Sequence, residues 1–162
     1  MAKPEDGLKA LLKVLRPGGL IELALYSDIA RREVTAGVEL RKAGNIESTA
    51  EGIRAFRQKV LALPPGAPGR NLKFATDFFS ISGCRDLIFH VQEHRFTLPA
   101  LDGLLRRHKL TLKQIILPED VKAGFRREFP AASDLDLKAW AEFETAHPDT
   151  FTRMYHIVAE KS

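Results

Sequence analysis

The sequence predicts an α/β domain built on part of a doubly wound sheet, with about three strands and a large helical insert. Three observations carry this prediction. A helical segment at 4–15 ends in Pro17-Gly18-Gly19 and leads directly into an apolar run of strand length at 20–26. Two further segments, 110–117 and 155–159, have strand character. Between the first two strands, residues 27–109 carry mainly helical patterns, which predicts the insert within a single domain of residues 1–162.

Length and composition limit the class of protein. With 162 residues, 44% hydrophobic and 28% charged, the chain can form one domain with its own core. A single cysteine, Cys84, excludes a disulfide framework within one chain and favours a reducing compartment. No apolar run approaches the ~20 residues of a membrane span, and the N-terminus lacks the apolar core of a signal peptide. We therefore expect a soluble, cytoplasmic protein with no membrane partner.

The elements of the first half follow from local signals. Regularly spaced leucines form one face of the helix at 4–15, and the run at 20–26 has the apolar character of a strand buried on both faces. Ser27 or Asp28 can cap a helix that ends near residue 43. Ser48 and Glu51 have capping-box spacing for the next helix. A Pro- and Gly-rich loop follows at 64–69, and the segment 71–95 predicts short helical turns.

The second half predicts a helix capped by Thr97, a strand at 110–117, helices at 119–129 and 135–145, and a last strand at 155–159. Ser133 or Asp134 is the expected cap of the helix at 135–145. No Gly-x-Gly-x-x-Gly or P-loop motif occurs in the chain, so no phosphate or dinucleotide cradle is predicted.

The segment Leu15-Arg16-Pro17-Gly18-Gly19-Leu20, followed by a strand, is similar to a segment of class I S-adenosylmethionine-dependent methyltransferases that precedes their fifth sheet strand. A second, more specific block resembles the C-terminal half of a bacterial group of these enzymes that often carries tetratricopeptide repeats. This block reads Ser-Gly-Cys-Arg-Asp-Leu at 82–87 and Phe-His-Val-Gln-Glu-His-Arg-Phe-Thr-Leu-Pro at 89–99. The tail, with Trp140, Phe143-Glu144 and Met154-Tyr155, fits the end of the same group.

This resemblance covers nearly the whole chain and implies a partial Rossmann-like sheet. It also implies methyl transfer from S-adenosylmethionine, with these residues supplying later strands and the acceptor side of the pocket. The acceptor itself is not indicated. The family's glycine-rich cofactor loop and ribose-binding acid lie upstream of the matching region. We therefore expect residues 1–162 to be the C-terminal portion of the domain, to bind S-adenosylmethionine weakly or not at all, and to be inactive alone.

Candidate site residues gather at two places in the sequence. Tyr26 and Ser27 follow the first strand, where ligands of open α/β sheets bind, and Arg31 lies one helical turn further on. The densest set of polar side chains in an apolar stretch is expected to line a pocket: Arg85, Asp86, His90, Glu93, His94 and Arg95. Of these, His90, Glu93 and His94 are the candidates for moving a proton. The alternative is a salt-bridged structural cluster, and for Tyr26 and Ser27 packing and helix capping.

Two other classes of function stay open. His90-x-x-Glu93-His94 matches the inverted zinc-peptidase signature, which on a helix would place both histidines on one face for zinc. Cys84 could be a nucleophile, although a lone cysteine is more often a buried apolar residue.

The second class of function is a non-catalytic module that associates with a second copy or with a missing N-terminal half, because part of a sheet leaves a strand edge unpaired. The net charge of +4 is spread over separated basic pairs and does not predict nucleic acid as a partner.

Overall fold

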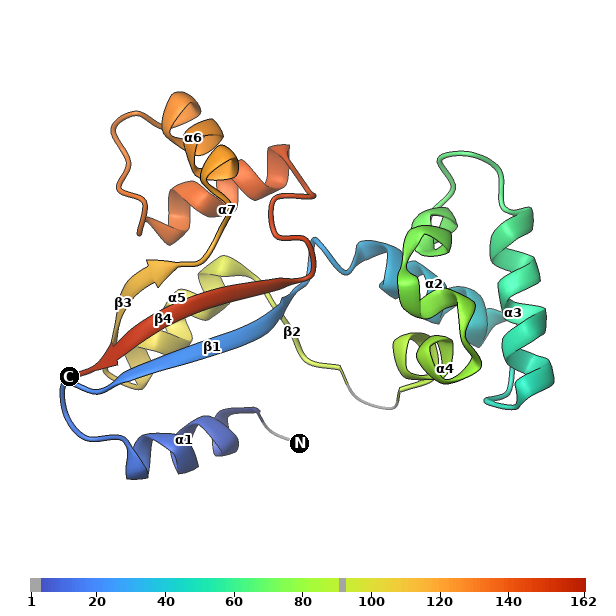
Figure 1. Cartoon of the computed structure of the whole chain (residues 1–162), viewed down its shortest axis with the longest axis horizontal. Coiled ribbons are helices and arrows are strands. Elements are labelled where there is room, and N and C mark those ends of the chain that lie inside the picture. The colour runs from blue at the N-terminus through green and yellow to red at the C-terminus, as the bar shows by residue number, and fades with distance from the viewer. Residues whose placement is uncertain (1–3, 91–92) are drawn as a thin grey trace. The chain divides into compact units, whose positions relative to one another are not determined.

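The computed structural model describes residues 4–90 and 93–162, which form two compact units (Figure 1). The sheet unit consists of Met1–Ala30 and His94–Ser162, and the helical unit consists of Arg31–Glu93. Within the described residues the chain has seven α-helices, two short 3-10 helices and one four-stranded sheet. None of the helices formed by these residues is both long enough and apolar enough to cross a membrane.

The sheet has the order β2-β1-β4-β3, formed by β1 (Leu20–Ser27), β2 (Arg95–Phe96), β3 (Leu110–Ile115) and β4 (Met154–Lys161). Strand β1 is parallel to β2, and β4 is antiparallel to both β1 and β3. Three strands therefore run in one direction and only the last strand opposes them. The α/β class is confirmed. The prediction of about three strands misses β2, whose two residues are too few to give a periodic pattern.

Contacts with the end of β4 hold in place the turn that leads into β1. Helix α1 (Pro4–Val14) is followed by the turn at Pro17, where Gly18 has a φ of +71° that favours glycine. The Gly18 N–H donates to the carbonyl of Lys161 at 2.8 Å. The Lys161 ammonium donates to the carbonyls of Leu12 and Leu15 at 2.6 and 2.8 Å, so a cation satisfies the C-terminal end of the helix.

Strand β1 is covered on only one face, which corrects the expectation of burial on both. Ile21, Leu23 and Leu25 pack against the hydrophobic core of the sheet unit. On the other face, Glu22 and Ala24 are exposed, and Leu20 is 60% exposed. The composition of the strand could not reveal this, because the number of covering layers is a property of the tertiary fold rather than of the segment.

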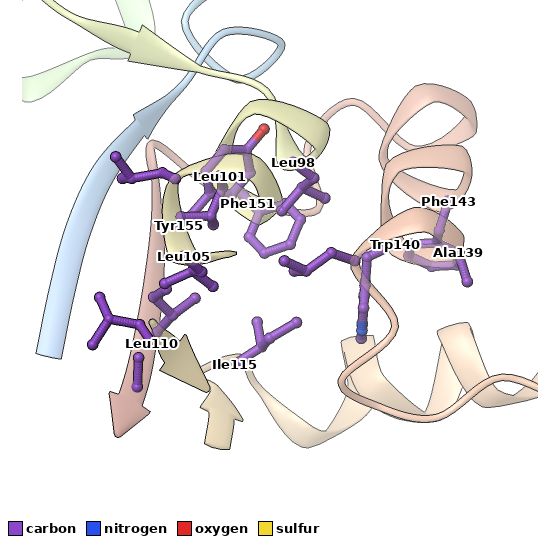
Figure 2. Packing of buried hydrophobic residues seen from close by; sticks show 14 of the residues in the cluster. Leu98, Leu101, Leu105, Leu110, Ile115, Ala139, Trp140, Phe143, Phe151 and Tyr155 are labelled. Carbon is purple, nitrogen blue, oxygen red and sulfur yellow. The ribbon is translucent and has the colours of Figure 1, made fainter. Parts of the chain in front are cut away.

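Three helices complete the sheet unit: α5 (Leu98–Arg107), α6 (Glu119–Glu128) and α7 (Leu137–Ala146). Leucines of α5, the aromatic face of α7 and residues of β3 and β4 form one core (Figure 2). Trp140 is fully buried and stacks on Phe125, with ring centroids 3.8 Å apart. The predicted cap of α5 is confirmed, since the Thr97 hydroxyl accepts from the Ala100 N–H at 3.3 Å.

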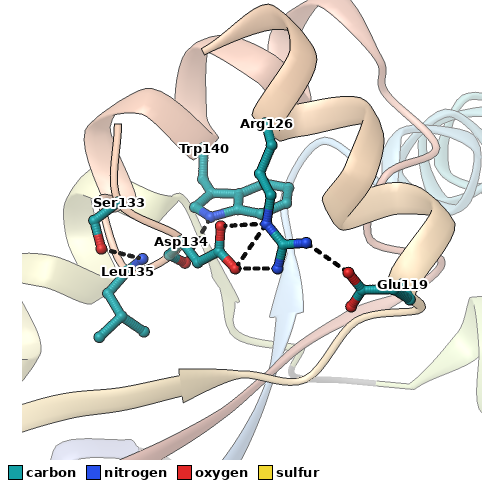
Figure 3. A network of polar contacts seen from close by, with 6 residues as sticks. All are labelled: Glu119, Arg126, Ser133, Asp134, Leu135 and Trp140. Atoms are coloured by element: carbon teal, nitrogen blue, oxygen red, sulfur yellow. Dashed lines mark hydrogen bonds and ion pairs between the residues drawn. The ribbon is translucent and has the colours of Figure 1, made fainter. Parts of the chain in front are cut away.

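A polar network joins α6 to the segment before α7 (Figure 3). Arg126 contacts Glu119 at 2.5 Å and donates through Nε to both oxygens of Asp134, at 3.0 and 3.2 Å. The Trp140 indole donates to the carbonyl of Asp134 at 2.9 Å. Because these contacts occupy Asp134, it does not cap α7. The cap is Asp136, which accepts from two backbone N–H groups, so the helix starts two residues later than predicted.

The helical unit contains α2 (Arg32–Ala43), α3 (Ala50–Ala62), α4 (Ile81–Phe89) and two 3-10 helices, Arg70–Phe74 and Thr76–Phe79. It has its own core, in which Phe56, Phe78 and Cys84 are fully buried. The predicted caps differ by a few residues: Thr49 rather than Ser48 caps α3, and α2 begins after Arg31.

The helical unit is shorter than the predicted insert at 27–109. Residues 94–109 belong instead to the sheet unit, because leucines of α5 are buried in its core.

Candidate functional site

The carboxyl ends of β1 and β2 lie side by side in the sheet unit. Tyr26 is paired with Arg95 and Ser27 with Phe96 in the parallel ladder, and the Asp28 N–H donates to the carbonyl of Phe96 at 2.9 Å. The Arg95 guanidinium lies 3.5 Å from the Asp28 carboxylate. Ligands of α/β sheets bind outside the carboxyl ends of strands. The carboxyl ends of β1 and β2, called the strand edge below, therefore present the half-buried phenol of Tyr26 and a partly exposed ion pair where a ligand would bind.

A buried polar network lies directly behind this edge. The Ser27 hydroxyl donates to Glu144 Oε1 at 2.5 Å, and the Tyr155 hydroxyl donates to Glu144 Oε2 at 2.8 Å. Ser27 Oγ also accepts from the Ala30 N–H at 3.0 Å. The three side chains come from β1, α7 and β4, and none is more than 1% exposed. The network therefore fixes the end of β1 to the helix and the strand that pack beside it.

Electrostatics distinguish Glu144 from the exposed acids of the chain. Burial raises the pKa of its carboxyl, and the hydrogen bonds from Ser27 and Tyr155 offset this only in part. The nearby negative charge of Asp28 raises the pKa of Glu144 further, while burial is the main cause that raises the pKa of Tyr155. No ion pair joins Glu144 to a cation among the residues that the structure describes.

Arg31 and Glu93 form a largely buried ion pair in the helical unit. Arg31 Nε donates to Glu93 Oε1 at 3.0 Å, and Arg31 also contacts the second carboxylate oxygen, so the pairing is bidentate. The Arg31 side chain is 7% exposed and that of Glu93 is 24% exposed. These two residues are the first and last of the unit, so the pair holds its two ends together. Glu93 would have to leave this pair before it could accept a proton.

The other predicted site residues are exposed. Arg85 and Asp86 lie on the outer face of α4, and His94 lies at the start of the returning segment of the sheet unit. Of the nine predicted site residues, Tyr26, Ser27 and Arg95 meet at the strand edge, and Arg31 meets Glu93.

The histidine motif does not form the single helix that zinc binding would use. Helix α4 ends at Phe89, and His90 is exposed and has the extended backbone angles φ −61° and ψ 138°. Val91 and Gln92, the middle of the motif, lie outside the described residues. In residues 4–90 and 93–162, no three His, Cys, Asp or Glu side chains gather in a way that could hold a metal ion.

The sequence did not identify Glu144 and Tyr155 as the buried residues that hold the strand edge in place. A signal for Glu144 was present, because it follows Leu137 and Trp140 at helical spacing on the face of α7 that is buried. A carboxylate at a position where the pattern calls for an apolar residue indicates a buried polar contact. No pattern could identify its partner, since Ser27 is 117 residues away.

S-adenosylmethionine, the cofactor that the resemblance implies, has no cradle in the described part of the chain. The family holds it with a glycine-rich loop, and in α/β folds such a loop joins a strand's carboxyl end to a helix. Here the glycines of the Pro17-Gly18-Gly19 turn precede β1, and the positive-φ residues Gly66 and Gly69 lie in the helical unit. At the carboxyl end of β1, Ser27 is occupied by Glu144. The described residues therefore do not fit the cofactor by themselves.

Comparison with known proteins adds no family assignment: no protein-family model and no curated protein sequence matches the chain.

Proposed function

We propose that the chain is the C-terminal part of an S-adenosylmethionine-dependent methyltransferase domain, supplying later strands of a Rossmann-like sheet and the acceptor side of its pocket. The observation that carries the proposal is the arrangement of the sheet. A helix and a Pro-Gly-Gly turn lead into β1, which is parallel to β2, and only the final strand β4 runs in the opposite direction. This is the arrangement expected for the later part of a doubly wound sheet that ends in one antiparallel strand.

The strand edge supports an acceptor-binding role. The ring of Tyr26 offers a flat surface and a hydroxyl, and the ion pair of Asp28 with Arg95 offers both an acceptor and a donor of hydrogen bonds. In methyl transfer the protein mainly positions the two reactants, and a polar group accepts the acceptor's proton where needed. Of the three predicted proton acceptors, Glu93 is held in an ion pair by Arg31 and would have to leave it before it could accept a proton.

The Ser27–Glu144–Tyr155 network supports the same role indirectly. A binding edge is effective when its residues are held by packed neighbours with satisfied hydrogen bonds. Ser27 is the residue between Tyr26 and Asp28, and Glu144 fixes its side chain in the core. Glu144 is therefore a positioning residue in this proposal and does not touch the acceptor.

The proposal is tested by calorimetric titration of S-adenosylmethionine into residues 1–162, together with the DNA sequence upstream of the Met1 codon. We expect little or no binding to 1–162, and an upstream reading frame that encodes a glycine-rich loop between a strand and a helix. A low-micromolar dissociation constant for 1–162 would show that we have misjudged what holds the cofactor. An upstream sequence without such a loop would remove the basis for a methyltransferase.

A further inference from the structure

Helix α3 of the helical unit carries two arginines and a leucine on one side (Figure 1). Arg54, Arg57 and Leu61 are three and four residues apart, the spacing that makes side chains neighbours on a helix surface. At 1.5 Å per residue they span about 10 Å along the helix. Arg54 is exposed, Arg57 is half-buried and Leu61 is 42% exposed.

A phenylalanine of the neighbouring 3-10 helix, Thr76–Phe79, lies beside these three residues. The Arg57 guanidinium donates from Nη1 to the carbonyl of Phe79 at 2.5 Å, which ties the end of the 3-10 helix to α3. The ring of Phe79 packs edge-to-face with that of Phe78, which is fully buried, and their centroids are 5.3 Å apart. Phe79 is nevertheless 63% exposed. We call Arg54, Arg57, Leu61 and Phe79 the α3 surface.

The positive charges of the α3 surface have no carboxylate partner. Among the residues that the structure describes, no acid lies within ion-pair distance of Arg54 or Arg57. In the sheet unit, by contrast, Arg106 pairs with an aspartate and Arg126 with a glutamate and an aspartate. Residues 50–90 contain six lysines and arginines but only three acids. The local charge therefore favours an anionic partner.

We propose that the α3 surface docks an acidic segment of a partner protein, whose carboxylates pair with Arg54 and Arg57 and whose apolar side chains cover Leu61 and Phe79. Guanidinium groups match carboxylates with two parallel hydrogen bonds, and arginine and aromatic residues are enriched in protein interfaces. The surface belongs to the helical unit and is separate from the sheet. The inference therefore goes beyond the proposed function and stands whether or not the chain belongs to a methyltransferase.

Nucleic acid and an anionic membrane also attract cationic surfaces, but the apolar side chains favour a protein. Single-stranded nucleic acid stacks successive bases on aromatic rings, whereas Leu61 has no ring beside that of Phe79. The other exposed phenylalanine of the unit, Phe74, has the Lys73 ammonium over its ring at 4.8 Å from the centroid. A helix that binds a membrane inserts its apolar face, and the apolar face of α3, with Ile53, is buried in the core of the unit.

The test uses fluorescein-labelled peptides of twelve residues, with binding to 1–162 followed by fluorescence anisotropy. In the probe peptide, pairs of glutamates alternate with pairs of leucines. One control replaces the leucines with serines, and the other replaces the glutamates with lysines. We expect the probe to bind at least about fivefold more tightly than either control, because the surface offers both charge and apolar contact. Added salt should weaken the binding of the probe.

Three variants locate the binding. Arg54→Glu changes an exposed side chain without a polar partner in the described part of the chain, so the fold should persist while probe binding weakens by about fivefold or more. Lys59→Glu is the matched control, because it makes the same change of charge about 140° around the same helix. It should leave probe binding nearly unchanged. Phe79→Ser should weaken binding of the probe and leave the serine control unaffected. Unchanged urea midpoints check the fold.

Three results would overturn the proposal. The first is no binding of the probe, or equal binding of the serine control. The second is equal weakening by Arg54→Glu and Lys59→Glu, because the attraction would then come from net charge rather than from this surface. The third is tighter binding to a deoxythymidine oligonucleotide or to phosphatidylserine vesicles than to the probe, lost in Arg54→Glu, because the occupant would then be nucleic acid or a membrane.

Discussion

Replacing Glu144 tests the buried network most sharply, because this carboxyl has two donors and no cation within the described residues. Its pKa is raised in the folded state, so the folded chain binds this proton more tightly than the unfolded chain does. The stability that the proton contributes is present below the unfolded pKa of about 4.3, and it is lost as the pH rises toward the folded value. In that window the free energy of unfolding falls by about 1.4 kcal/mol per pH unit from this group alone.

The assay is urea denaturation of the wild type and Glu144→Gln at a series of pH values from 4 to 8. Glutamine keeps the size of the side chain and does not titrate. The stability of the wild type relative to Glu144→Gln should therefore decline as the pH rises above about 4.3, before it levels off. Groups that do not interact with Glu144 contribute equally in both proteins and cancel in the difference. A wild type that gains stability over the variant with rising pH would refute the reasoning, because it would mean that the folded state stabilises the charged carboxylate.

The Glu144→Ala variant measures how much the Ser27–Glu144–Tyr155 network contributes to the free energy of unfolding. It leaves the buried hydroxyls of Ser27 and Tyr155 without their acceptor. At about 1–3 kcal/mol for each buried group that loses its partner, the expected destabilisation is about 2–6 kcal/mol. Tyr155→Phe removes one donor and leaves Glu144 with Ser27, so it should cost less than Glu144→Ala. Equal stability of Glu144→Ala and wild type would show that the network contributes nothing.

The remaining predictions concern the helical unit and the histidines. Glu93→Gln removes the charged partner of the buried Arg31 guanidinium and should destabilise the chain in urea by about 2 kcal/mol, less than for a fully buried pair because Glu93 is partly exposed; no change would assign the pair no stabilising role. Burial raises the pKa of the Cys84 thiol, so a thiol reagent at pH 7 should label it only after unfolding, whereas rapid labelling of the native chain would favour a nucleophile. Chain purified without an affinity tag should contain far less than one zinc per molecule, and stoichiometric zinc lost in His94→Ala would establish the metal site.

Local signals predicted those parts of the fold that depend on neighbouring residues. The Thr97 cap, the Pro-Gly-Gly turn and the last strand were predictable because their determinants lie within a few residues. Strand β2 was not, because two residues become a strand only through pairing with β1. The cap of α7 moved from Asp134 to Asp136 because Arg126, on another helix, holds Asp134.

The candidate site shows the same division. Tyr26 and Ser27 were predicted from their position after the first strand, whereas Arg95 was predicted as one of the polar side chains of 85–95. The structure places all three along the carboxyl ends of β1 and β2. The role of Ser27 as a donor to Glu144 was not predictable, since it depends on a contact between residues 117 positions apart. The histidine motif has metal-ligand spacing only on a continuous helix, and α4 ends at Phe89. The sequence therefore predicted where Tyr26 and Ser27 lie in β1, while only the tertiary fold shows that Arg95 lies beside them.

The measurement that tests the proposed function most directly is transfer of a labelled methyl group from S-adenosylmethionine to small-molecule and macromolecular fractions of an extract from the source cells. It compares residues 1–162 with a longer polypeptide that includes the upstream reading frame. We expect a labelled acceptor with the longer polypeptide and no label with 1–162. In the longer polypeptide, Asp28→Asn and Arg95→Met, which each separate the ion pair at the strand edge, should lower the transfer rate. A longer polypeptide that binds no S-adenosylmethionine and labels nothing would contradict the assignment to methyltransferases.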